Sequence, residues 1–125
     1  MIIGTAQDAA SLLIPLVSGF KGEKIVAAHL DSDQRLLETI ESGNGGHDRV
    51  ELPIRAIIED ALRLGSAGLI VAHNHPSGDP TPSQADLAAT RELAATAASL
   101  GIQLHDHLII GDDGDCRSLR ALGLL

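Results

Sequence analysis

Hydrophobic positions along this 125-residue chain alternate between helical and strand-like spacing. After Thr5, which can cap a helix, apolar residues recur at intervals of three and four and predict a first helix. Residues 24–30 and 35–41 predict two strands, joined by a polar turn at residues 31–33. The glycine-rich residues 42–48 predict a flexible loop. The N-terminal third of the chain is therefore expected to form a helix and a hairpin.

The rest of the chain continues this alternation. Pro53 suits the first turn of a second helix, which Gly65 is expected to end. Residues 68–72 (GLIVA) are apolar throughout, which predicts a central strand covered on both faces. A third helix is expected from Ser83 to about Leu100, followed by strands at residues 102–110 and 117–119. The residues expected to face inward are Ile54, Ile57, Ile58, Ala61 and Leu62 in the second helix, and Leu87, Leu93, Ala94, Ala97 and Leu100 in the third.

This order of elements predicts an α/β fold in which a mixed sheet is flanked by helices. A chain of 125 residues can bury one hydrophobic core, so we expect residues 1–125 to form a single domain. Aromatic residues are almost absent, with Phe20 as the one example, so the core is expected to be aliphatic.

Composition also limits the function. A net charge of −8, without a basic stripe, argues against tight direct binding of nucleic acid. Cys116 is the sole cysteine, which excludes an intramolecular disulfide and a cysteine-rich zinc site. No apolar run reaches membrane-spanning length and no basic segment follows Met1, so we expect a cytoplasmic protein without membrane contact.

The strongest chemical signal begins at the end of the central strand. His73 and His75 are followed by seven residues and then by Ser83-x-x-Asp86. Residues i and i+2 of an extended segment share a face, so both imidazoles can reach one ion, and Asp86 lies on the first turn of the next helix. Two nitrogens and one oxygen suit a catalytic zinc that keeps a fourth position for water.

Each part of this pattern has a simpler interpretation. Ser83 and Asp86 also form a helix capping box, which is the better interpretation of this pair taken alone. A single histidine at the end of a strand is more often structural than a ligand. The fixed spacing of all four residues favours the metal site, and Ser83 can serve as cap and site residue together.

The run HNHPSGDPTPS followed by Asp86 resembles the metal motif of the JAMM (MPN-plus, JAB1-like) metallopeptidase family, in particular its RadC-like branch. The resemblance extends from about Leu12 to the C-terminus. It implies a JAB/MPN-like fold, similar to the cytidine-deaminase-like architecture, with one Zn²⁺ per chain. It further implies hydrolysis of amide or isopeptide bonds, with a peptide or protein tail as substrate. Relatives of this branch carry an N-terminal helix-hairpin-helix region, for which we expect no room here.

The resemblance also implies two catalytic roles. Glu23 matches the family's glutamate between the first helix and first strand, which serves as general base and then general acid. Ser83 is expected to steady the oxyanion. Beside Lys24 on a turn, a glutamate is commonly a solvated charge; the substitutes would be Glu38, Glu41 and Glu51.

One segment departs from the family pattern. RadC-like domains commonly open the second helix with a His-Pro-Arg-Glu segment, where this chain has Pro53-Ile54-Arg55-Ala56. Arg55 is retained, but the histidine and the glutamate are not. A different substrate or weaker catalysis would follow if those groups bind substrate in the relatives.

Four further histidines carry weaker signals. His105 and His107 form a second H-x-H pair, but no third ligand follows at a useful spacing, so we expect packing or support of the metal site. His29 and His47 carry no functional signal. Two other functions stay open, a DNA-repair accessory role and a non-catalytic, zinc-stabilised interaction module. The sequence also leaves the oligomeric state open, a homodimer included.

Overall fold

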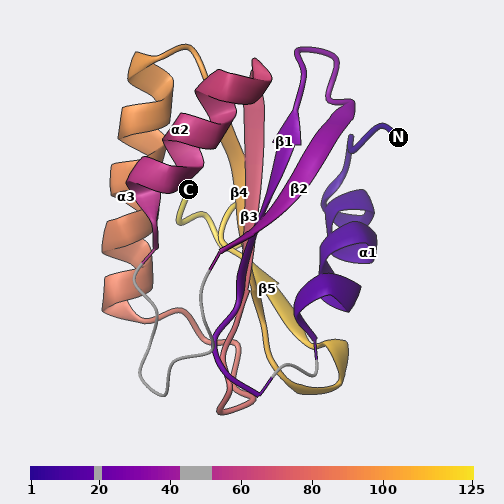
Figure 1. The fold of residues 1–125 in the computed structure, drawn as a ribbon. Coiled ribbons are helices and arrows are strands. Elements are labelled where there is room, and N and C mark those ends of the chain that lie inside the picture. The colour runs from indigo at the N-terminus through magenta and orange to yellow at the C-terminus, as the bar shows by residue number, and fades with distance from the viewer. Residues whose placement is uncertain (19–20, 43–51) are drawn as a thin grey trace.

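A five-stranded mixed sheet lies between helices on its two faces (Figure 1). The computed structural model describes residues 1–18, 21–42 and 52–125. Most of the expected loop, together with His47 and Glu51, lies outside these residues. The elements in chain order are α1 (Ala6–Val17), β1 (Ile25–Leu30), β2 (Leu36–Ser42), α2 (Ile54–Leu64), β3 (Gly68–Asn74), α3 (Gln84–Ser99), β4 (Gln103–Ile110), the short 3-10 helix η1 (Asp112–Gly114) and β5 (Cys116–Ser118).

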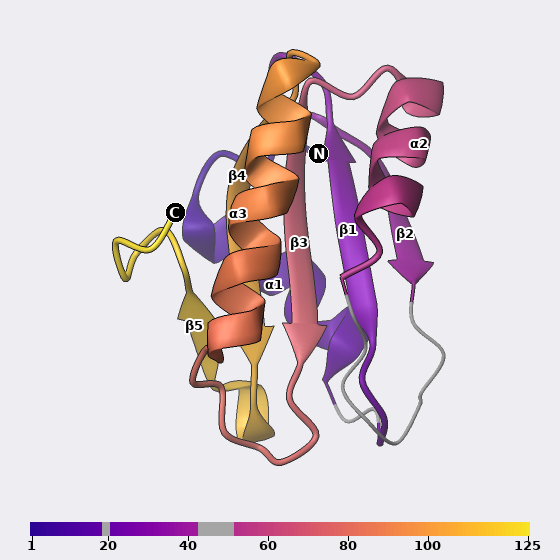
Figure 2. The same ribbon diagram turned by 90° about the vertical axis from the view of Figure 1, so that its left-hand side faces the viewer.

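The strand order in the sheet is β2-β1-β3-β4-β5. Strands β3 and β4 run parallel, and every other neighbouring pair is antiparallel. Parallel neighbours need a crossover connection, and α3 supplies it on one face of the sheet. Figure 2 shows α3 in front of β3 and β4, with α2 on the same face. The expected α/β fold with a mixed sheet flanked by helices is confirmed.

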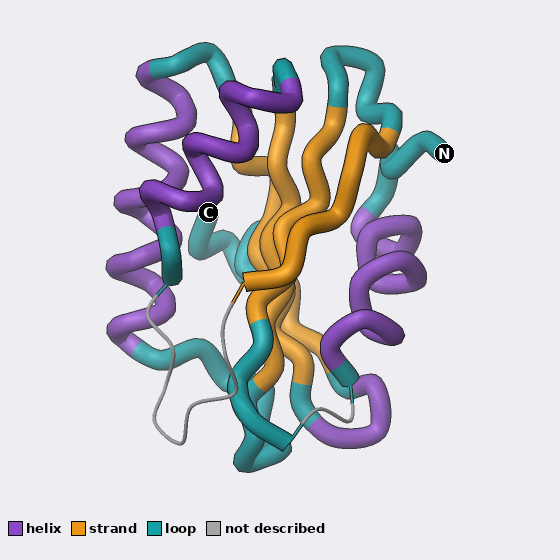
Figure 3. Tube along the Cα trace, viewed as in Figure 1, coloured by secondary structure: helices purple, strands orange, loops and turns teal. Residues whose placement is uncertain are grey.

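The two faces of the sheet have separate apolar cores, because side chains alternate along each strand. Every residue of β1 and β3 is buried. Val26 and Ile70 pack with Leu13 of α1 on one face, and their neighbours Ile25 and Val71 pack under α2 and α3 on the other. Figure 3 shows the sheet between these helical layers. By this alternation, His73 lies on the same face as Val71, beneath α3.

Of the three α-helices in the described residues, two begin with a reciprocal cap. Thr5 and Asp8 form a capping box at α1, and Ser83 and Asp86 form one at α3. In each box the hydroxyl accepts an N–H of the first turn while the carboxylate accepts the N–H of the capping residue. Helix α2 follows Pro53 without a side-chain cap. The cap predicted from Ser83-x-x-Asp86 is therefore confirmed.

The prediction that residues face inward is wrong at two positions, Leu62 and Leu100. Leu62 is 58% exposed, because α2 buries only the narrow stripe of Ile57, Ile58 and Ala61. Leu100 is 48% exposed, since it follows the last turn of α3 with non-helical backbone angles and so leaves the inward stripe. Neither change alters the architecture.

In residues 1–18, 21–42 and 52–125, none of the helices combines the length and apolarity needed to cross a membrane.

Candidate metal centre

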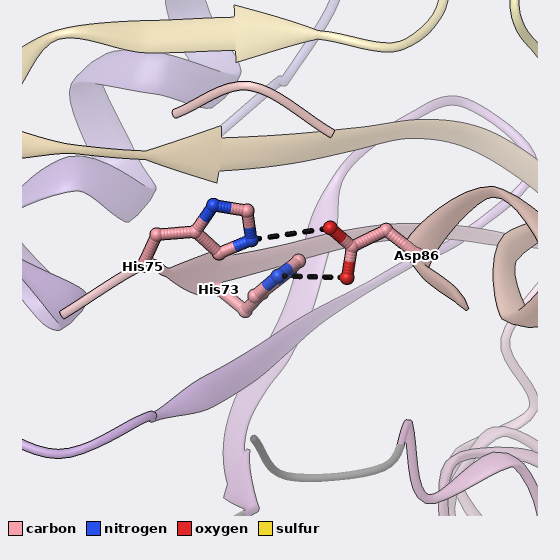
Figure 4. Close-up of side chains that lie close together, drawn as sticks. All are labelled: His73, His75 and Asp86. Carbon is pink, nitrogen blue, oxygen red and sulfur yellow. Dashed lines mark hydrogen bonds and ion pairs between the residues drawn. The ribbon is translucent and has the colours of Figure 1, made fainter. Parts of the chain in front are cut away.

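Side chains of β3 and α3 meet where β3 ends, at the carboxyl edge where open α/β sheets commonly hold their sites. Nε2 of His73 lies 3.4 Å from Oδ1 of Asp86, and Nε2 of His75 lies 3.1 Å from Oδ2 (Figure 4). The ligand atoms of the three residues all lie within 4.8 Å of one another. All three side chains are at most 17% exposed. The three predicted ligands are thus gathered into one group of nitrogen and oxygen donors.

These distances fit the size of a zinc ion. Four ligands about 2.0–2.1 Å from a tetrahedral centre lie about 3.3 Å from one another. The Nε2 atoms of His73 and His75 lie 3.4 and 3.1 Å from Asp86, each from a different oxygen of the carboxylate, and both separations are close to that value. Two imidazoles with one carboxylate are also a donor set that zinc accepts, with one position left for water.

The loop after His75 orients its imidazole. Nδ1 of His75 lies 2.8 Å from the backbone oxygen of Asp79. A carbonyl can only accept, so Nδ1 carries the hydrogen and Nε2 is the atom with a lone pair for a metal. The Asp79 carboxylate in turn accepts from the backbone N–H of Thr81 at 3.0 Å and from its hydroxyl at 2.7 Å. The Asp79 carboxylate thus orders the loop that holds the His75 ring.

The capping box fixes the Asp86 carboxylate. Its Oδ2 accepts the Ser83 backbone N–H at 2.8 Å, while the Asp86 N–H donates to Ser83 Oγ at 3.0 Å. Burial acts to raise the pKa of Asp86, but its close contact with the His73 ring and the hydrogen bond from the Ser83 backbone outweigh it and hold the pKa well below its usual range. Asp86 is therefore anionic at neutral pH, as a zinc ligand requires.

Two residues outside the predicted ligand set are linked in series to Nδ1 of His73, the ring nitrogen that does not face Asp86. His107 of β4 is 2% exposed, and its Nε2 lies 2.7 Å from Nδ1 of His73. Thr90 of α3 is 1% exposed and lies 2.6 Å from Nδ1 of His107. Burial lowers the pKa of His107 to about 3, with His73 acting in the same direction, so its ring is neutral.

Thr90 was missed, although the sequence held a signal for it. Asp86, Thr90, Leu93 and Ala97 follow one another at intervals of four, three and four, the spacing of one helical stripe. The last three are buried, and Asp86 is partly buried at the N-terminal end of the stripe. His105, by contrast, lies at the register irregularity of β4. It belongs neither to the group of His73, His75 and Asp86 nor to the pair of His107 and Thr90.

Glu23 lies just before β1 and is 7% exposed. Ile25 pairs with His73, and Lys24 and Asn74 are joined by two hydrogen bonds. Continued by two residues, this antiparallel register aligns Glu23 with His75. The substitutes Glu38 and Glu41 lie on β2, which β1 separates from β3.

A pocket of about 350 Å³ adjoins His73 and Asp86. Its lining is mostly apolar, with Glu92 as its further acidic residue. The start of α2 contributes Ile54 to this wall, so part of the segment that departs from the family pattern borders the site. Arg55 instead points outward, with its side chain 92% exposed, and lies 3.6 Å from Glu59. The lining residues are Ile25, Leu52, Ile54, His73, Ala85, Asp86, Ala88, Ala89, Glu92 and His107.

The mixed sheet, the βαβ crossover and a His-His-Asp group at its carboxyl edge together define a domain of the JAB type. A family described as "RadC-like JAB domain" matches residues 3–124, so the chain belongs to the RadC-like JAB-domain family.

Curated relatives support the same assignment. The chain is 45% identical over 103 residues to a UPF0758 protein of Rhodobacter capsulatus, covering 82% of this chain and 48% of the relative. It is 42% identical over 110 residues to a UPF0758 protein of Coxiella burnetii, covering 88% and 49%. The chain thus spans about half the length of the curated relatives that it matches. The name of these relatives specifies no reaction.

Proposed function

We propose that this domain is a zinc-dependent hydrolase that cleaves amide or isopeptide bonds in a peptide or protein tail. The observation that carries the proposal is the convergence of two imidazole Nε2 atoms and an anionic carboxylate within 4.8 Å at the edge of the sheet. His73, His75 and Asp86 would hold the ion. Membership of a JAB-domain family, which the resemblance links to metallopeptidases, supports the same chemistry.

Zinc, when bound, supplies a Lewis acid that activates water and polarises a carbonyl. Glu23 is the group that accepts the proton of the attacking water and returns it to the leaving nitrogen. Its support is the register that aligns it with His75, together with its burial at the start of β1. Residues i and i+2 of an extended strand share a face, so Glu23 belongs to the face on which Ile25 and His73 lie.

Ser83 is proposed to donate a hydrogen bond to the oxyanion that forms from the substrate carbonyl. Its Oγ already accepts the Asp86 N–H at 3.0 Å. That bond uses a lone pair of the hydroxyl oxygen and leaves its hydrogen able to donate. The cap and the catalytic role are therefore compatible.

The pocket beside the metal centre supports a substrate with apolar character. Aliphatic side chains line it beside His73, Asp86, Glu92 and His107, and its volume of about 350 Å³ suits one or two side chains of an extended peptide. An acidic chain with a net charge of −8 supports a protein or peptide partner over direct, tight nucleic-acid binding.

One observation favours a second candidate, a non-catalytic module that zinc stabilises. The segment at the start of α2 that differs from the family pattern borders the pocket, and Ile54 lines the pocket there rather than a polar side chain. A pocket with this apolar residue in place of a polar one could hold a partner segment without cleaving it.

The experiment that separates the candidates compares wild type with Glu23→Gln, both loaded with zinc. Peptides and isopeptide-linked lysine conjugates with aliphatic residues next to the scissile bond serve as substrates. The hydrolase predicts cleavage by wild type and its loss in the variant at equal zinc content. Equal cleavage by both proteins would show that Glu23 is not the base. Binding of the conjugates without cleavage by either protein would favour the interaction module.

A further inference from the structure

His107 and Thr90 form a buried connection between two of the proposed metal ligands. The connection starts at the backbone oxygen of Asp86, which accepts the Thr90 hydroxyl at 2.6 Å. It continues from Thr90 Oγ1 to His107 Nδ1 at 2.6 Å and from His107 Nε2 to His73 Nδ1 at 2.7 Å. The bond from the Thr90 hydroxyl has an ordinary O–H···O length, and the two bonds that involve ring nitrogens are at or just below the short end of the usual range. These hydrogen bonds join side chains of α3, β4 and β3.

The direction of every bond follows from counting hydrogens. A carbonyl oxygen can only accept, so the single hydroxyl hydrogen of Thr90 goes to Asp86. Thr90 Oγ1 must then accept from His107, which places a hydrogen on Nδ1 of that ring. In an imidazole with a single ring hydrogen the other nitrogen accepts, so His107 Nε2 accepts from Nδ1 of His73.

The ring nitrogen of His73 that would face a metal is Nε2. With its hydrogen on Nδ1, a neutral His73 has its lone pair on Nε2. Nε2 is the atom that lies 3.4 Å from Asp86 Oδ1. A neutral imidazole without such a partner can carry its hydrogen on either nitrogen, and one of the two forms presents an N–H to the ion.

We propose that His107 and Thr90 are positioning residues that hold His73 in the tautomer whose Nε2 can bind a metal. The inference rests on the proposed function for its metal, but the hydrogen-bond chain itself is a property of the metal-free protein. His75 is set independently, by the backbone oxygen of Asp79. Two different parts of the fold would thus orient the two imidazoles: strand β4 with helix α3 for His73, and the loop after β3 for His75.

The register of the sheet explains why His107 can do this. In the parallel pair, Val71 lies opposite His107 and His73 lies opposite Ile109. His73 and His107 are therefore diagonal neighbours on the face beneath α3, with ring centroids 4.8 Å apart. The register irregularity of β4 lies between the partners of Leu69 and Ile70, before His107. Without that irregularity the alternation would turn the side chain of residue 107 to the α1 face.

The first test uses the metal-free protein and no substrate. Nitrogen-15 NMR with scalar couplings across the hydrogen bond reports which ring nitrogen holds the hydrogen between His73 and His107. We expect a one-bond coupling to Nδ1 of His73 and a weak coupling across the bond to Nε2 of His107. A one-bond coupling to His107 Nε2 would overturn the inference.

The second test is zinc affinity, measured by competition with a chromogenic chelator. Loss of a residue that orients a metal ligand typically weakens metal binding by about 10- to 100-fold. We expect that loss in Thr90→Val, which keeps the shape of the side chain but lacks the hydroxyl. Thr90→Ser should restore affinity, because it restores the donor and acceptor.

His107→Leu and His107→Gln provide a second matched pair. The glutamine carbonyl can accept from His73 where leucine cannot, so Gln should bind zinc more tightly than Leu. Equal zinc affinity in wild type, Thr90→Val and His107→Leu would overturn the inference while leaving the hydrolase proposal intact. Absence of zinc binding by wild type would instead contradict the proposed function, and the NMR result would still decide the direction of the hydrogen-bond chain.

Discussion

Asp86 serves both as a helix cap and as a proposed metal ligand, and the chain offers a control that separates the two. Thr5 and Asp8 form the same capping box at α1, with bonds of 3.2 and 3.0 Å that correspond to 2.8 and 3.0 Å at Ser83 and Asp86. Asp8 belongs to no metal-binding group among the described residues. Asp8→Asn therefore reports the capping effect alone, and Asp86→Asn reports that effect and the loss of the anionic ligand.

The two contributions differ in size. An asparagine oxygen can still accept the N–H of the capping residue, so we expect each variant to lose about 1 kcal/mol or less from the cap. Zinc at a hundred times its Kd adds about 2.7 kcal/mol to the stability of a protein that binds it only when folded. At about 4 °C per kcal/mol for a domain of this size, that is a rise in Tm of about 10 °C.

The assay is thermal unfolding followed by circular dichroism, in zinc and in a chelator. Wild type and Asp8→Asn should both show the zinc-dependent rise in Tm, and Asp86→Asn should lose most of it. An undiminished rise in Asp86→Asn would refute the assignment of Asp86 as a ligand. A loss of the rise in Asp8→Asn would show that the effect comes from helix capping.

Three further predictions follow from the same geometry. Glu23→Gln should lower kcat by about 10²- to 10⁴-fold while zinc content by elemental analysis stays unchanged, and loss of zinc as well would mean a structural role. Gly78 has φ +89° and its added Cβ would overlap the Asp112 carboxylate, whereas Gly101 has φ +75° and open space. Gly78→Ala should therefore lose about 1–3 kcal/mol by urea unfolding and weaken zinc binding, more than the matched Gly101→Ala, and equal effects would contradict this. Burial lowers the pKa of His29 in the folded protein, so the unfolded chain binds more protons at acid pH. Its contribution to stability is present above about pH 6.5, the unfolded value, and is lost as the pH falls below it. The slope of unfolding free energy between pH 7.5 and 5.5 should be smaller in His29→Leu, and an unchanged slope would refute the shift.

Much of the fold and the three-residue group could be predicted because the signals are local. Apolar spacing predicted the helices and strands. His73, His75 and Asp86 are at most thirteen residues apart and are joined by one loop. Thr5 and Ser83 could be identified as caps because a capping box lies within four residues. The error at Leu62 arose because local spacing does not report how wide a face the neighbouring element covers, and the error at Leu100 because it does not report the residue at which the helix ends.

The support of the site by His107 could not be derived from spacing alone. Its contact with His73 joins residues 34 apart and depends on the parallel pairing of β3 and β4. It also depends on the register irregularity in β4, which decides the face on which His107 lies. Thr90 meets His107 only after α3 has packed on the sheet. The helical stripe indicates that Thr90 faces the sheet, but tertiary packing decides which residue it meets there.

The central claim is that His73, His75 and Asp86 hold one zinc ion, and metal content tests it most directly. The protein would be purified from cells without a nickel column and measured by elemental analysis, for wild type and Asp86→Ala. The account predicts about one zinc per chain in wild type, on the stoichiometry of a three-ligand site, and its loss in the variant. Wild-type protein without bound metal, and without a rise in Tm when zinc is added, would contradict the account.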